Sequence, residues 1–186
     1  KMVDVPAVLK KQLWFWFTML QVCSGKAAIP DPDERLPAWA HDVYTDSAGG
    51  SLRSHGLGAG AVTLGWWSIL PWSYVINSGQ LAANGRRLDR TMSALELVGP
   101  LMALVGAHRL WRGGSVRFWV DNSGSVFIWR KGYSNSCPLC TTLVKAISVV
   151  AAGIGCRVDV VKITRCSIPL ADMADALSKN SLQRFW

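Results

Sequence analysis

Four acidic residues occupy positions from which a side chain could take part in chemistry. Asp46 follows a β-prone run and precedes a small, glycine-rich turn, and Asp121 ends a second strand-like run. Glu96 lies near the start of an apolar helical pattern, and Asp175 lies in the last helical segment. The chain contains only twelve acidic residues, so these four are a substantial part of its carboxylates.

Gathered at one point, these carboxylates would form a metal site. Clustered carboxylates repel one another, and a bound cation relieves that repulsion. Hard oxygen ligands suit Mg²⁺ or Mn²⁺. Two such ions can activate a water molecule and stabilise the leaving oxygen of a phosphodiester. Taken singly, each acid is better explained as a turn former, a capping residue or a solvated charge; for all four in this order that explanation is weaker, and spacing alone leaves it open.

The elements that must position these acids follow the order β-β-β-α-β-α-α-β-α, which predicts an α/β domain with a mixed five-stranded sheet flanked by helices. Three strands form an antiparallel meander, and a helix then crosses over to a parallel strand. The expected strands are 43–46, about 58–67, about 72–76, 115–121 and 156–164, and the expected helices are 93–112, 122–129, about 138–152 and one beginning at Pro169.

In this order the first and fourth strands can be parallel neighbours. Asp46 and Asp121 would then lie close together near the centre of the sheet. Glu96, in the crossover helix, can lie above Asp46 and Asp121, and Asp175, in the last helix, can lie beside them.

The chain divides into an N-terminal helix and linker, residues 1–41, and a main domain, residues 42–186. The apolar run Leu13–Leu20 is far short of the roughly 20 residues that a membrane-spanning helix needs. We therefore expect a helix packed on protein rather than a membrane anchor.

The composition predicts a polyanionic partner. Twenty basic residues against twelve acidic ones give a net charge of +8, and nucleic acid is the first candidate, with solubility alone as the alternative. Five irregularly spaced cysteines and an opening without a signal-peptide layout favour a reducing compartment, the cytoplasm or the nucleus. Cys137 and Cys140 have zinc-like spacing but no second close pair follows them.

Four short motifs resemble a known family. They are Thr45-Asp46-Ser47 with following glycines, Glu96-Leu97, Val120-Asp121-Asn122, and Ala174-Asp175-Ala176-Leu177-Ser178. Together they resemble ribonuclease H, and most closely the ribonuclease H domain of retrotransposon reverse transcriptases. The resemblance covers residues 42 to 180, and the N-terminal segment resembles the connection that follows the polymerase in such polyproteins.

The resemblance implies a two-metal nuclease that cuts the RNA strand of an RNA–DNA hybrid, with two Mg²⁺ or Mn²⁺ ions and the reverse transcriptase as a further partner. Its catalytic and metal-binding carboxylates carry over to Asp46, Glu96, Asp121 and Asp175. The expected substrate contacts are Ser47, Asn122, Ser123, Lys131, Tyr133 and Arg165.

One position departs from the family pattern. Many members carry a histidine on the loop before the last helix, whereas the matching stretch here, residues 163–169, has none and places Arg165 closest to it. Arginine cannot act as a general base near neutral pH, but it can hold a phosphate. Two other interpretations therefore remain: a non-catalytic module of the same fold that binds nucleic acid or supports a polymerase, and a related two-metal DNA nuclease or integrase.

Overall fold

The computed structural model describes residues 10, 13–15, 17, 39–49, 58–72, 92–164 and 168–181. The chain divides into two units, Lys1–Ala38 and Trp39–Trp186. The boundary expected from the sequence, between residues 41 and 42, stays a prediction. In the first unit the described residues are helical, and the rings of Trp14 and Phe17 stack with their centroids 5.7 Å apart. Most of the expected N-terminal helix and linker lies outside the described residues.

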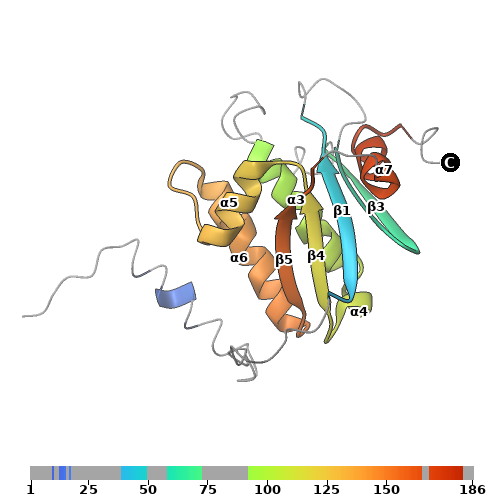
Figure 1. Ribbon diagram of the computed structural model, residues 1–186. Helices are drawn as coiled ribbons and strands as arrows, with labels where there is room; N and C mark the ends of the chain where they lie inside the picture. The colour runs from blue at the N-terminus through green and yellow to red at the C-terminus, as the bar shows by residue number, and fades with distance from the viewer. Residues whose placement is uncertain are drawn as a thin grey trace, which may run out of the picture. The chain divides into compact units, whose positions relative to one another are not determined.

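The second unit contains a mixed five-stranded sheet in the order β3-β2-β1-β4-β5 (Figure 1). The strands are β1 (His41–Ser47), β2 (Gly58–Thr63), β3 (Trp66–Pro71), β4 (Ser115–Val120) and β5 (Arg157–Lys162). The first three strands pair antiparallel, whereas β1 with β4 and β4 with β5 pair parallel. The predicted sheet and its crossover are confirmed.

Helices cover both faces of this sheet. They are α3 (Met92–Gly106), α4 (His108–Trp111), α5 (Ser123–Lys131), α6 (Pro138–Gly153) and α7 (Pro169–Ser178). Figure 1 shows α3, α5 and α6 grouped together and α7 apart from them, beside β1 and β3. Of two adjacent residues in β2, Ala61 belongs to the core with α3 and Gly60 faces α7, so the two helices lie on opposite faces.

The main core lies between the sheet and the helices α3 and α6. Along β4, Val116, Phe118 and Val120 are buried on this side, and the alternate residues Arg117 and Trp119 remain partly exposed on the other. This alternation fixes which face of β4 holds the core. Asp121 is the next residue after the strand.

The predicted third strand, 72–76, is wrong, because the third strand is Trp66–Pro71 and begins inside the segment assigned to the second. Thr63 pairs with Trp66, so Leu64 and Gly65 form a two-residue hairpin loop, in which Gly65 adopts φ +80. Gly65 is one of three glycines in the segment 58–67, so it did not stand out as a turn. Residues 73–76 lie outside the described residues.

The helix expected over residues 93–112 is two helices. α3 ends at Gly106 and α4 follows after Ala107, and Trp111 donates its indole N–H to the backbone oxygen of Ala103 near the end of α3 at 2.9 Å. The same oxygen also accepts the Ala107 amide at 3.0 Å, so the indole is a second donor that ties α4 to the end of α3. Among the described residues, no helix is both long and apolar enough to cross a membrane.

Candidate metal centre

Asp46, Glu96 and Asp121 form a cluster in which one carboxylate oxygen from each residue lies within 4.8 Å of the others. Asp46 stands near the end of β1, and Asp121 directly follows β4. These strands are parallel neighbours, so their carboxyl ends meet at one edge of the sheet. Glu96 belongs to α3, which packs on β1, and its side chain is buried. The sheet edge and one helix therefore bring the three acids together.

Close packing between α3 and β1 helps to hold Glu96 in this position. At Gly99 a methyl group would lie 2.8 Å from Cβ of Thr45, so only glycine lets the helix approach this near. The hydroxyl group of Ser47 is buried and donates to the backbone oxygen of Leu95 at 2.8 Å. The Ser47 side chain thus ties β1 to α3; Ser47 also lines the cavity that holds the acids, and its contact with substrate stays a prediction.

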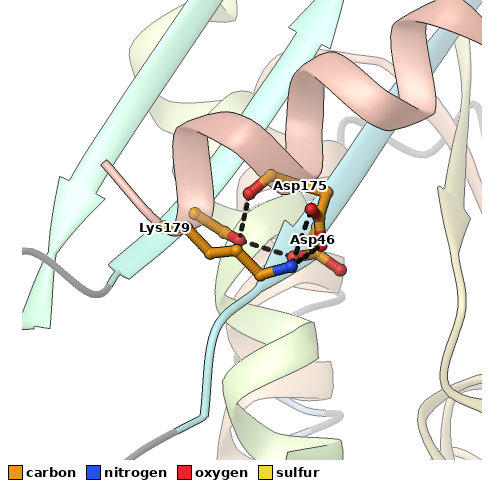
Figure 2. Close-up of polar contacts among 4 residues, drawn as sticks. Asp46, Asp175 and Lys179 are labelled. Carbon is orange, nitrogen blue, oxygen red and sulfur yellow. Dashed lines mark hydrogen bonds and ion pairs between the residues drawn. The ribbon is translucent and has the colours of Figure 1, made fainter. Parts of the chain in front are cut away.

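Asp175 stands beside this cluster but is not one of its three members. It lies on α7 and lines a cavity of about 350 Å³ together with Asp46, Glu96 and Asp121. Its carboxylate forms an ion pair with Lys179, whose Nζ lies 2.5 Å from Oδ1 and 2.7 Å from Oδ2 (Figure 2). Asp175 is thus near enough to share the cavity while a lysine holds its carboxylate.

A second cavity of about 370 Å³ adjoins the acids on the α7 side of the sheet. Asp46, Asp121 and Asp175 line it, together with the rings of Tyr44 and Trp119. These two rings stack on neighbouring strands with their centroids 6.2 Å apart and their planes 11° apart. The carboxylates therefore face a recess with an aromatic wall.

Burial raises the pKa of the Asp46 carboxyl above its ordinary value, and the negative charges of Asp175 and Asp121 raise it further. A hydrogen bond from Ser178 and the positive charge of Lys179 oppose this shift of the pKa. The raised pKa means that the negative charge of Asp46 is disfavoured at this position. A bound cation would lower that cost.

Ser178 was not expected from the sequence to belong to the site. Its buried hydroxyl group lies 2.5 Å from Oδ2 of Asp46 and 2.9 Å from the backbone oxygen of Asp175, and its single proton can be given to either. The available signal was its position in the same helix, three residues after Asp175. With Lys179, it places the last turn of α7 against the carboxylates.

Asn122 and Ser123 lie at the start of α5, next to Asp121. The Asn122 side chain caps this helix, because its Oδ1 accepts the Ser125 amide at 3.0 Å and the Ser93 hydroxyl at 3.2 Å. Asn122 lines the cavity that holds the acids, and Ser123 is exposed.

Lys131 and Tyr133 lie at the far end of α5. A helix of nine residues spans about 13 Å, so this pair is well separated from Asp121. The Nζ atom of Lys131 lies 4.5 Å from the centroid of the Tyr133 ring, and both residues are exposed. Arg165 lies outside the described residues.

The donor set fits a hard divalent cation. Three carboxylate oxygens from three different elements converge, and oxygen is the donor that Mg²⁺ and Mn²⁺ prefer. The partly exposed Asp46 and Asp121 leave the cluster open toward the cavity, so a cation bound there could also contact a ligand.

No protein-family model and no curated protein matches this chain. Among solved structures, it is similar to an N-terminal RNase H domain from Mycobacterium tuberculosis, solved as a fusion with maltose-binding protein, with a TM-score of 0.50, 19% identity, and coverage of 77% of this chain and 95% of that chain. It is also similar to RNase H1 from the halophilic archaeon Halobacterium salinarum NRC-1, with a TM-score of 0.50, 14% identity, and coverage of 77% and 97%. The chain has an RNase H-like fold, as the sequence predicted.

Proposed function

We propose that this chain is a metal-dependent nuclease that hydrolyses the RNA strand of RNA–DNA hybrids. The observation that carries the proposal is the cluster of Asp46, Glu96 and Asp121 at the adjoining ends of β1 and β4. In an RNase H-like fold, three converging carboxylates are well suited to hold a divalent cation against a phosphodiester.

Each acid has a distinct part in the proposal. Asp46 and Asp121 are the central ligands, because both end strands at one sheet edge and both line the two cavities. Glu96 and Asp175 come from helices and each completes the shell of one of two Mg²⁺ or Mn²⁺ ions. Such ions supply an activated water and stabilise the leaving oxygen when they are bound.

The proposed substrate is held mainly through its backbone. A net charge of +8 suits a polyanion, and A-form-like helices are recognised by shape, phosphates and 2′-hydroxyl groups, so we expect little sequence specificity. Asn122 and Ser123 would contact the strand next to the acids. Lys131 and Tyr133 would contact it further along α5, and Arg165 would hold a phosphate.

The proposal extends to a retroelement reverse transcriptase as the setting of this domain. Its support is the resemblance of residues 174–178 and of the motif around Asp121 to that branch of the family. The polymerase part of the same polyprotein would then be a partner, and residues 1–41 the connection to it.

The test is incubation of the protein with end-labelled RNA–DNA hybrid, double-stranded DNA and double-stranded RNA, with Mg²⁺, Mn²⁺ or EDTA. We expect cleavage of the RNA strand of the hybrid only, and none in EDTA. Asp46→Asn should lower the cleavage rate by several orders of magnitude while hybrid binding falls far less. The comparison variant is Asp172→Asn, an exposed acid of the same helix as Asp175 that lines the second cavity but lies outside the cluster, and it should lose far less activity.

The absence of a histidine from residues 163–169 favours a second candidate, a non-catalytic module that binds nucleic acid or supports a polymerase. Binding of hybrid without cleavage at any Mg²⁺ or Mn²⁺ concentration would establish the module. Full activity in Asp46→Asn would instead show that the cleavage site lies elsewhere.

A further inference from the structure

The last turn of α7 brings a positive charge into the carboxylate site. Lys179 contacts both oxygens of Asp175, and it lines both cavities alongside Asp46, Asp121 and Asp175. In Figure 2 the ammonium group lies beside the carboxylates of Asp175 and Asp46. The Lys179 side chain is 51% exposed, so it has room to leave this position.

We propose that Lys179 is an internal counter-ion that competes with one of the two metal ions for Asp175. This inference rests on the proposed function, because it concerns how the same site is loaded. The first ion would bind at Asp46, Glu96 and Asp121, and the second would bind only when Lys179 releases Asp175. Lys179 thereby sets the metal concentration at which the site becomes complete.

The argument follows from where the charges lie. Asp175 stands outside the cluster of converging oxygens, and its carboxylate is paired with Lys179. An ammonium group about 5 Å from a divalent ion repels it, and even in a water-like dielectric this changes affinity on the order of tenfold. Lys179 also lines both cavities with Asp46, but its ion pair is with Asp175, so removing its charge should affect the first ion less than the second.

A purely structural role for the same ion pair predicts something different. Lysine and aspartate four residues apart on a helix are a common surface pair that contributes little to stability. If that were the whole role of Lys179, its removal would alter stability slightly and leave metal affinity unchanged. Metal binding therefore separates the two roles.

The experiment is calorimetric titration of the full chain with MnCl₂ and with MgCl₂, in the absence of nucleic acid. Lys179→Met removes the charge and keeps most of the side-chain length, whereas Lys179→Arg keeps the charge. The control is Lys145→Met on α6, a helix that contributes no lining residue to either cavity.

We expect two affinity classes in the wild type, and in Lys179→Met a second ion that binds about tenfold more tightly, with a smaller gain for the first. Lys179→Arg and Lys145→Met should match the wild type. The inference is overturned if Lys179→Met leaves the second affinity within twofold of the wild type, weakens it, or yields no second ion.

Hybrid cleavage, measured on the same samples, separates this inference from the proposed function. If the metal affinities shift as expected but no variant cuts hybrid, the counter-ion role stands and the nuclease is refuted. If the wild type cuts hybrid but Lys179→Met binds metal as the wild type does, the nuclease stands and the counter-ion is refuted. If no protein binds metal, both fall.

Discussion

At the scale of single residues, the partly buried charge of Asp46 makes this site costly to fold without metal. Because the folded-state pKa of Asp46 is raised, the folded protein binds a proton at this carboxyl more tightly than the unfolded chain does. The stability from this group is fully present below the unfolded-state pKa, about 3.9, and is lost as the pH rises through the folded-state pKa. At neutral pH the ionised Asp46 carboxylate should therefore lower the free energy of unfolding of the metal-free protein.

Asp46→Asn removes this loss of stability. We expect the metal-free variant to melt at a higher temperature than the wild type at pH 7, and the difference to disappear as the pH falls below about 4, where the unfolded-state carboxyl is also protonated. Thermal denaturation in EDTA at several pH values measures it. A variant that melts below the wild type at pH 7 would show that the charge of Asp46 is well compensated in the fold.

Ser178→Ala tests the contact between α7 and Asp46. Loss of this buried donor should cost about 1–3 kcal/mol of unfolding free energy, since Oδ2 of Asp46 loses a partner. Metal affinity should fall on the order of tenfold, as for other residues that orient a ligand. Chemical denaturation and metal titration measure the two effects. Ser148→Ala is the matched control, because its hydroxyl donates only within α6, to Val144 at 2.9 Å, and an equal loss in both variants would exclude a role at the site.

At the scale of elements, the site depends on how closely α7 lies on the sheet. Gly60 pairs with Asp46, and a methyl group there would lie 2.5 Å from the backbone oxygen of Ala174 and 2.7 Å from Cβ of Leu177. The opposing atoms include backbone, so relief requires α7 to move and to carry Asp175 and Ser178 away from Asp46.

Gly60→Ala should therefore lower the unfolding free energy by about 1–3 kcal/mol and reduce cleavage as well. Denaturation and the hybrid assay provide the two measurements. In Gly153→Ala the added methyl meets nothing within 4 Å, so that variant should fold and cut as the wild type does. Normal cleavage in a destabilised Gly60→Ala would show that the position of α7 is not needed for activity.

Sequence patterns predicted the elements that carry the acids but not the contacts between them. The β-prone runs ending at Asp46 and Asp121 and the crossover between them were enough to predict parallel neighbours, and therefore a shared edge. The Leu64–Gly65 hairpin was missed because Gly65 is one of three glycines in the segment 58–67. The bonds of Ser178 and Lys179 depend on the rotation of α7 about its axis, which packing at Gly60 determines and local propensity does not.

At the scale of the whole molecule, the excess of basic residues should dominate binding. With a net charge of +8, hybrid affinity should fall steeply with salt, and each phosphate contact should add roughly one unit to the log–log slope. Lys131→Ala should reduce that slope by about one unit if the residue contacts a phosphate. Fluorescence anisotropy measured between about 50 and 200 mM salt, a range over which phosphate contacts change the affinity strongly, gives the slopes. A binding constant that does not change with salt would exclude nucleic acid as the main partner.

The central position of β1 also affects how fast the chain can reach its native state. Its pairing with β4 joins His41 to Val116, and the bond between Ser178 and Asp46 spans 132 residues. Closing such loops costs chain entropy before any contact is gained, so domains dominated by distant pairings fold slowly, over milliseconds to seconds. The acids come from the beginning, middle and end of the domain, so the full set meets only when these distant segments have come together. Partly folded forms of this chain should therefore lack the complete site and be unable to cut.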